Sequence, residues 1–512
     1  MSFLERQPLG LWVGAVGATV ALAGLGLLAL GRANPGAPSP PLSDVPTIEG
    51  PWLFVDDSIL ETLDGVVRQV VPAKRFRTTP VVTSGPGHRN WQPWVTVLAS
   101  LDGRPFRMWY NASRRIPPSP DESPTVLGYL TSPDGLRWLA PFHPLETIQP
   151  LTFGARVLDR GEAFQPPDRR FAALYFAMPP AAPPESAGIH LAFSRDGMTW
   201  QAYEANPVIR SGLDDIVDVT WDGTESRYIL TMKLYRQYTW TGSDNQERTD
   251  GIRLVGIAYS PDLVEWSEPR VLFAPDRADP GVTEWYGSCC IQRRGPVFVG
   301  FLKVSRDDLA APGNDDEEDF GYGYTTLLWS RDGTSWSRGR HPDVFLAPDP
   351  DPGAWDRSHA WIDSMIRVRD ELFLYYGGYR SGHKGNRFSD RQLGVVKVPV
   401  DRFVALVTGD QRGRIVTRPF RFSGDELSLN VVVPRRRSVD IRVLDSDANP
   451  IRGFDFRDCS DAAGDSVRRV VRCRGDVRTL TGTVVRLEAL LPPRTRLFAL
   501  NVCSSGDPRP CP

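Results

Sequence analysis

Two carboxylates, Asp215 and Glu284, stand at the starts of neighbouring segments whose residues alternate as in β-strands. Hydrolysis of a glycosidic bond requires one carboxylic acid that protonates the leaving oxygen and a second carboxylate that acts as base or nucleophile. Asp215, or nearby Asp218, would form such a pair with Glu284 if the fold places the two segments side by side. The competing interpretation is that these carboxylates only bind turn amides or pair with arginines.

A repeated tight turn predicts the elements that position these residues. The pattern Ser-x-Asp-x-x-x-Trp occurs at residues 132–138, 194–200, 260–266 and 330–336, and a degenerate copy follows at 399–403. The Ser and Asp side chains can accept hydrogen bonds from local backbone amides, and the Gly that follows Asp in three copies can adopt a positive φ. Short apolar or alternating segments precede every copy, so we expect five units of β-strands.

The spacing of the turns predicts a five-bladed β-propeller over residues 51–407. Four short strands need about 40–45 residues, and the remainder of each repeat falls between the second and third strands. These insertions lie at residues 113–125, 178–187, 237–250, 305–321 and 380–391. In an up-and-down blade such loops emerge on the face where the next innermost strand begins. We therefore expect one face walled by five loops.

Polar and aromatic residues near the expected starts of the inner strands are candidates for ligand binding. They are His88, Asn90, Trp91, Arg156, Asp218, Tyr286 and His359, and Arg380 at the start of the fifth insertion is a further candidate. The histidines match no metal-site spacing, so we expect no metal and no cofactor. Calcium is the one open possibility, at the acidic run of residues 315–319, although a solvated loop is the favoured interpretation there.

The sequence resembles the five-bladed glycoside hydrolase families 32, 43 and 68, and uncharacterised bacterial proteins like families 32 and 43. The resemblance spans residues 51–502 and is carried by the segments WLFVDD at 52–57, RMWY at 107–110, GRIVT at 413–417 and LSLN at 427–430. It implies that Asp215 stabilises the transition state and that Glu284 is the general acid. Those families carry an aspartate on the first inner strand, where this chain has amides. Asp57 would replace it if its strand reaches the same face.

The expected function is therefore that of a glycoside hydrolase-like protein acting on oligosaccharide or polysaccharide. A non-catalytic propeller that binds glycan or protein is the alternative, because amides replace the acid of the first blade. A sialidase-like protein is a minor alternative, because the turn of that class also runs from Ser and Asp to Trp. The near balance of 60 Lys and Arg against 62 Asp and Glu disfavours nucleic acid as a partner.

The two ends of the chain differ in character from the repeats. Residues 9–31 contain no ionisable group and are long enough to span a bilayer, so we expect a signal anchor within residues 1–32 and a Pro-rich linker at 33–50. The globular part would then lie outside the cytoplasm, at the cell surface or in the periplasm, or be secreted if the segment is cleaved. Residues 408–512 alternate as in a small β-sandwich.

The cysteines support an oxidising location. Four of them fall in the last 54 residues, and the short intervening loops favour the pairs Cys459–Cys473 and Cys503–Cys511 over the other connectivities. The alternative is four free thiols in a cytosolic tail. Cys289 and Cys290 have apolar neighbours and are interpreted as buried filler.

Overall fold

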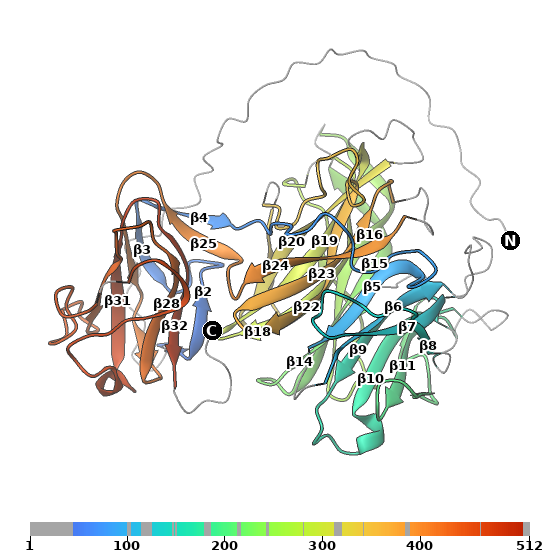
Figure 1. Ribbon diagram of the computed structural model, residues 1–512, viewed down its shortest axis with the longest axis horizontal. Helices are drawn as coiled ribbons and strands as arrows, with labels where there is room; N and C mark the ends of the chain where they lie inside the picture. The colour runs from blue at the N-terminus through green and yellow to red at the C-terminus, as the bar shows by residue number, and fades with distance from the viewer. Residues whose placement is uncertain are drawn as a thin grey trace, which may run out of the picture. The chain divides into compact units, whose positions relative to one another are not determined.

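The computed structural model describes residues 45–504 except for 100–103, 114–124, 146–147, 149–150, 179–185, 212–216, 242–244, 280, 312–319, 341–342, 384–389 and 461. Within these ranges the chain is all-β, as the sequence predicts, with no α-helix (Figure 1). Short 3₁₀ turns such as η2 (Pro167–Arg169) and η5 (Val477–Leu480) interrupt the strands.

Five units of antiparallel strands follow one another along the chain, and a parallel pairing of Gly323 with His359 joins the last two units into one seven-stranded sheet (Figure 1). Unit 1 contains β5 (Asn90–Leu98), β6 (Phe106–Ser113), β7 (Thr125–Ser132) and β8 (His143–Leu145); unit 2 contains β9 (Phe153–Asp159), β10 (Phe171–Ala177), β11 (Gly188–Ser194), β12 (Trp200–Ala202) and β13 (Ile209–Arg210). Unit 3 contains β14 (Val217–Asp222), β15 (Arg227–Thr241), β16 (Glu247–Ser260) and β17 (Arg270–Phe273). Unit 4 contains β18 (Thr283–Arg294), β19 (Val297–Ala310), β20 (Phe320–Ser330) and β21 (Trp336–Arg338); unit 5 contains β22 (His359–Val368), β23 (Glu371–Tyr379) and β24 (Gln392–Pro399).

The first strands of the five units contact one another in a closed cycle. β5 contacts β9, β9 contacts β14, β14 contacts β18, β18 contacts β22, and β22 returns to β5. Hydrophobic clusters fill the spaces between neighbouring units, and the cluster that contains Met108 and Phe373 joins unit 1 to unit 5. A bridge from Val82 to Leu393 adds the chain before β5 to the outer edge of unit 5. Unit 1 and the segment before it are thus packed against and paired with unit 5.

The repeated turns form as the sequence predicts, each at the end of a third strand. In the turn after β11, Ser194 Oγ accepts a hydrogen bond from the amide of Gly197 at 2.9 Å, and Asp196 Oδ1 accepts two from the following amides at 2.8 Å. The other three turns repeat this pattern. The turn carbonyls also hold neighbouring units together, since Gly197 O accepts from Trp109 Nε1 at 2.7 Å and Gly135 O accepts from Tyr375 Oη at 2.7 Å.

We expect Gly197→Ala to destabilise the fold by roughly 2–4 kcal/mol. Gly197 has a φ of +79°, and a Cβ there would lie 2.8 Å from Cζ2 of the buried Trp109 ring. The matched control is Gly161→Ala, where φ is +92° but no atom lies within 4 Å of the added Cβ, so only the backbone cost of about 1–2 kcal/mol applies. Denaturant titration of the two variants measures the difference, and equal losses would contradict this account.

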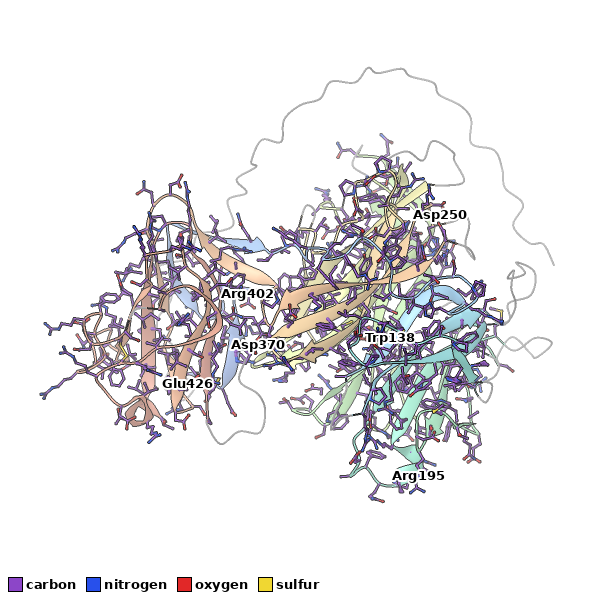
Figure 2. The ribbon with its side chains drawn as sticks, in the orientation of Figure 1. Trp138, Arg195, Asp250, Asp370, Arg402 and Glu426 are labelled. Atoms are coloured by element: carbon purple, nitrogen blue, oxygen red, sulfur yellow. A yellow bond between two sulfur atoms is a disulfide. The ribbon has the colours of Figure 1, made fainter. Side chains whose placement is uncertain are left out.

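One expected loop of the walled face is a strand pair instead. Residues 237–250 were expected to form a loop, but β15 continues to Thr241 and β16 begins at Glu247, with Tyr238 paired with Asp250. Figure 2 labels Asp250 on this projecting hairpin. Residues 247–250 are all polar and exposed, so this arm pairs without burying a face. The hairpin leads directly into the residues of the site described below.

The C-terminal sheets include strands from both ends of the described chain. They are built from β25 (Val404–Thr408), β26 (Gly413–Thr417), β27 (Phe420–Phe422), β28 (Glu426–Val432), β29 (Asp440–Leu444), β30 (Asp465–Val470), β31 (Val484–Leu491) and β32 (Arg496–Cys503). To these the chain adds β1 (Thr47–Ile48), β2 (Gly50–Leu53), β3 (Leu60–Asp64) and β4 (Val66–Val70), which pair with β27, β32, β26 and β25. Residues 47–70 and β25 pair with C-terminal strands rather than with the five units, so the expected boundaries at residues 51 and 408 fall inside these sheets.

The expected disulfide between Cys459 and Cys473 is present. Cys503 is also disulfide-bonded, and its expected partner Cys511 lies outside the described residues. So does the apolar stretch of residues 9–31. Among the described residues, no helix has the length and hydropathy needed to cross a membrane.

Candidate functional site

Glu284 is the second residue of β18, opposite Ser305 near the end of β19. Its side chain is buried, and its Oε2 accepts a hydrogen bond from Arg253 Nη1 of β16 at 2.6 Å. Asp307 approaches the same guanidinium, with an Oδ2 to Nη1 distance of 4.0 Å. Burial and the Asp307 carboxylate raise the pKa of Glu284 to about 7, while Arg253 acts in the opposite direction. A carboxyl group with this pKa is partly protonated near neutral pH and is suited to donate a proton.

Tyr286 lies beside this acid at a point where β18 departs from regular pairing. The register of β18 with β19 shifts between Trp285 and Ser288. The Tyr286 ring stacks on Trp361 with centroids 4.8 Å apart, and the Arg253 guanidinium lies 4.9 Å from its centroid. Burial raises the pKa of Tyr286 well above its usual value. Tyr286 thus belongs to a buried aromatic layer beneath Glu284 and does not present its ring to solvent.

Two buried ion pairs cross between the units next to this layer. Arg156 of β9 pairs with Asp218 of β14 at 2.7 Å, and Lys303 of β19 pairs with Asp363 of β22. Arg156 Nη1 also donates to the carbonyl of Asp363 at 3.0 Å. Burial raises the pKa of Asp218, although Arg156 acts in the opposite direction. The structure therefore brings the candidates Arg156 and Asp218 together as a buried pair that joins units 2 and 3, and Arg156 also bonds to unit 5.

The candidates near the start of β5 make contacts within the protein. His88 is half-buried, with Nε2 3.4 Å from the carbonyl of Trp138, and burial lowers its pKa. Asn90 is buried, and its Nδ2 donates to the carbonyl of Arg391 at 2.8 Å. Trp91 is buried as well. These side chains fasten the first strand to its surroundings.

His359 and Arg380 lie at the same end of the β22–β23 hairpin of unit 5. His359 begins β22, and Arg380 directly follows β23. His359 is fully buried, with Nδ1 2.7 Å from Ser358 Oγ, and its ring lies 4.7 Å from that of Trp361. Burial, with the charge of Arg391, lowers the pKa of His359 well below its usual value, so the imidazole is neutral. Arg380 is exposed just after β23, and its carbonyl accepts from Arg357 Nε at 3.0 Å.

Asp57 does not lie at Glu284, which corrects the expectation from the sequence. It is half-exposed between β2 and β3 and pairs with Arg68. Its neighbour Asp56 binds Arg331, next to Ser330, and Ser330 pairs with Phe298 of β19. Phe298 is seven residues from Ser305, the partner of Glu284, or about 23 Å along the strand. Asp57 is therefore at the opposite end of unit 4. Asp215 lies outside the described residues.

Three residues of this region are absent from the sequence-based candidates: Arg253, Lys303 and Asp307. Arg253 and Lys303 stand within strands, where a cation is usually exposed. Their partners Glu284 and Asp363 are 31 and 60 residues away. The one available signal is the run Ser-Arg-Asp-Asp at residues 305–308, which places polar residues directly after the apolar start of β19.

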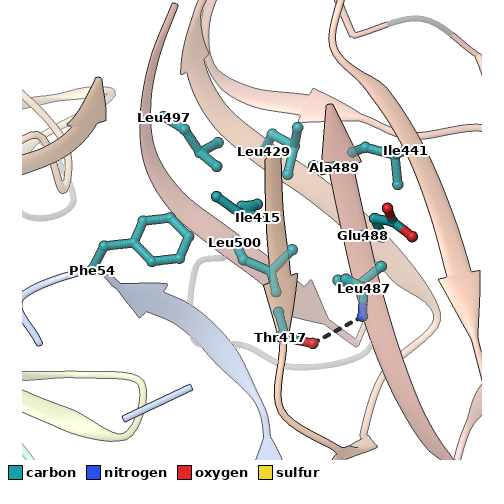
Figure 3. Close-up of a pocket in the computed structure, with 10 residues that line it drawn as sticks. All are labelled: Phe54, Ile415, Thr417, Leu429, Ile441, Leu487, Glu488, Ala489, Leu497 and Leu500. Carbon is teal, nitrogen blue, oxygen red and sulfur yellow. Dashed lines mark hydrogen bonds between the residues drawn. The ribbon is translucent and has the colours of Figure 1, made fainter. Parts of the chain in front are cut away.

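No group of three or more metal-ligating side chains is present in the described part of the chain. The acidic run of residues 315–319 lies outside it. A small cavity occurs elsewhere, in the core of the C-terminal sheets, where Figure 3 shows a lining that is apolar apart from Thr417 and Glu488. Glu488 is paired there with Arg414 and Arg442, each at 2.6 Å. This cavity is separate from the residues around Glu284.

Comparison with known sequences gives partial likenesses. No family model matches the chain. Two curated relatives, the uncharacterized proteins MT1551 and Rv1502 from two strains of Mycobacterium tuberculosis, are each 30% identical over 161 residues, which is 31% of this chain and 47% of the relative. The chain thus spans about half the length of the curated relatives it matches.

Similar solved structures share little sequence with this chain. One, described with the GH130 family of mannoside phosphorylases, is 15% identical, with 68% of this chain and 96% of that chain covered and a TM-score of 0.42. An N-acetylgalactosamine deacetylase from F. plautii is 16% identical, with coverages of 67% and 96% and a TM-score of 0.42. A glycosyl hydrolase from Bacteroides ovatus is 14% identical, with coverages of 65% and 94% and a TM-score of 0.42. With TM-scores this low, the function proposed below rests on the residues of this chain.

Proposed function

We propose that this protein is a glycoside hydrolase-like enzyme that acts on oligosaccharide or polysaccharide, with Glu284 as its general acid. The observation that carries the proposal is the buried Glu284 carboxyl, held between Arg253 and Asp307, with a pKa raised to about 7. A group that retains its proton near neutral pH can transfer it to the departing glycosidic oxygen.

The second carboxylate in this proposal is Asp215, which precedes β14 by two positions in the sequence. β14 contacts β18, the strand that carries Glu284, and this neighbourhood supports the assignment. Asp215 would act as base or nucleophile on the sugar carbon while Glu284 protonates the leaving group. We further infer that units 1–5 are the blades of a five-bladed β-propeller followed by a C-terminal β-sandwich, which the closed cycle of first strands supports.

A non-catalytic glycan-binding protein is the second candidate. It is favoured by β5, where Asn90 uses its amide to bind the carbonyl of Arg391 and no carboxylate stands at this end of the strand. It is also favoured by the direct ion pair between Arg253 and Glu284 at 2.6 Å, since a charged partner can hold the carboxylate ionised.

Incubation of the full-length chain with a panel of neutral and acidic oligosaccharides distinguishes the two candidates. Release of reducing ends that depends on Glu284 supports hydrolysis. Saturable glycan binding without release, unchanged in Glu284→Gln, supports the binding protein and overturns the enzymatic proposal.

We also propose that residues 9–31 anchor the protein in a membrane with its globular part outside the cytoplasm. The 23 residues carry no ionisable group, and burial of so many apolar side chains strongly favours the bilayer. Deletion of residues 1–32 should move the protein from the membrane fraction to the soluble fraction. Full-length protein found in the soluble fraction without proteolytic trimming would contradict the anchor.

A further inference from the structure

Two adjacent cysteines, Cys289 and Cys290, lie in the interior of β18 with their sulfur atoms in contact. The two Sγ atoms are 3.0 Å apart. Cys290 has a φ of +61°, in the left-handed region that non-glycine residues seldom adopt, and the register of β18 with β19 shifts between Cys289 and Gln292. The backbone is thus turned at this point so that two side chains of consecutive residues face each other rather than opposite sides of the sheet.

The surroundings of this pair do not suit a thiol that reacts with a substrate or binds a metal from solvent. Both side chains are 1% exposed, and Cys289 Sγ lies 3.0 Å from the carbonyl of Ile362 on β22. Burial raises the pKa of the Cys289 thiol well above its usual value, and a reagent in solvent cannot reach either thiol of a reduced pair in the folded protein. Any oxidation of the pair must therefore precede closure of the core.

The other described cysteines show that this chain is compatible with oxidising conditions. Cys459 and Cys473 form a disulfide, and Cys503 is disulfide-bonded. Structural disulfides are typical of proteins that fold outside the cytosol. A chain that forms these bonds during folding exposes Cys289 and Cys290 to the same oxidant while β18 is still accessible.

We propose that Cys289 and Cys290 form a vicinal disulfide that closes during folding. The oxidant is a disulfide, carried by a thiol oxidase or a small-molecule thiol. One cysteine thiolate attacks it to form a mixed disulfide and release a thiolate. The neighbouring thiolate then attacks the mixed disulfide, so that the Sγ–Sγ bond forms and the oxidant leaves as two reduced thiols after uptake of the two protons.

The proposed bond has a structural consequence for β18. Consecutive α-carbons are about 3.8 Å apart across a trans peptide, closer than in ordinary disulfides, so the ring fixes the local backbone in the turned conformation. Glu284 and Tyr286 precede this turn on the same strand. The disulfide would therefore hold the irregular part of β18 from which both side chains project, whether the site hydrolyses glycans or only binds them.

Peptide mapping tests the proposal directly. The full-length chain is refolded in a glutathione redox buffer until Cys459 and Cys473 are paired, then denatured with an alkylating reagent and no reductant, and digested with trypsin. Cleavage after Arg277 and Arg293 releases residues 278–293, whose only cysteines are Cys289 and Cys290. We expect this peptide to be two hydrogen atoms lighter than its reduced form, to carry no alkyl group, and to accept two after reduction.

A peptide of residues 278–293 that carries two alkyl groups before reduction overturns the proposal, as does linkage of either cysteine to another peptide. The Cys459–Cys473 bond is the internal control for oxidation in the same digest. In Cys290→Ser the remaining Cys289 should become alkylated without reduction, while the Cys459–Cys473 pair stays intact. Because the readout is covalent mass, it is independent of the proposed glycosidase activity.

Discussion

Glu284→Gln is expected to lower turnover of glycosides with poor leaving groups by about 10²- to 10⁴-fold. The amide keeps the shape of the side chain, but its N–H protons are far too weakly acidic to be transferred to the departing oxygen. Aryl glycosides whose leaving groups need no protonation should be much less affected, and glycan binding should survive. Steady-state kinetics on both kinds of substrate measure the contrast between them.

The same carboxyl sets the expected pH dependence. Burial and Asp307 raise the pKa of Glu284 to about 7, so its protonated form is present below that pH and is lost as the pH rises through it. Activity of the wild type should fall along this alkaline limb. In Asp307→Asn the neighbouring negative charge is removed, so the limb should move to lower pH.

Glu265→Gln is the matched control for Glu284→Gln. Glu265 is exposed in a repeated turn, where only its backbone amide bonds Asp262, so the same substitution there should leave turnover unchanged. Equal activity of Glu284→Gln and wild type on natural glycans would remove Glu284 from the catalytic role. A uniform loss on both substrate types would instead indicate a structural defect.

Lys303→Met is expected to destabilise the protein by about 3–5 kcal/mol. Lys303 is 1% exposed and pairs with the Asp363 carboxylate, whose other oxygen accepts from the amide of Val95. Methionine nearly preserves the volume but leaves the buried Asp363 carboxylate without its cation, a cost that the unfolded chain, where the charge is in water, does not bear. Denaturant midpoints of the full-length chain measure the loss.

A second substitution separates charge from packing. Asp363→Asn in the Lys303→Met background removes the orphaned charge, so the double variant should be more stable than the sum of the two single losses predicts. Lys397→Met is the matched control, because Lys397 and its partner Glu371, 3.7 Å away, are both partly exposed and such a pair contributes about 1 kcal/mol or less. Similar losses in Lys303→Met and Lys397→Met would contradict the importance of burial.

The repeated turns were predictable because all their defining interactions are local. Ser194, Asp196 and Gly197 bond to one another or to amides within three residues, so the letters alone specify the geometry. The strands that precede them follow from their apolar alternation. The all-β class and the order of the five units rest on the same short-range pattern.

The pairings of the site were not predictable in the same way. Arg253 meets Glu284 only because β16 and β18 lie in neighbouring units, and Lys303 meets Asp363 across the next boundary. The register shift after Trp285 decides which side of the sheet the Tyr286 side chain faces. The pattern of polar and apolar residues in the sequence does not predict this shift. The sequence-based position of Asp57 was wrong because β2, β3 and β4 pair with C-terminal strands. Such long-range pairings produce no repeated pattern in the sequence.

The pairing of β2 with β32 affects how the chain is made. Trp52 lies opposite Leu500, so a ribosome must add 448 residues after Trp52 before its partner is in the chain, which takes roughly 20–90 s at typical translation rates. Throughout that interval β2 lacks its native neighbour, and β3 and β4 remain unpaired until β26 and β25 have been made. A nascent chain of this kind needs a chaperone or a translocation channel to keep those edges apart from other chains until synthesis is complete.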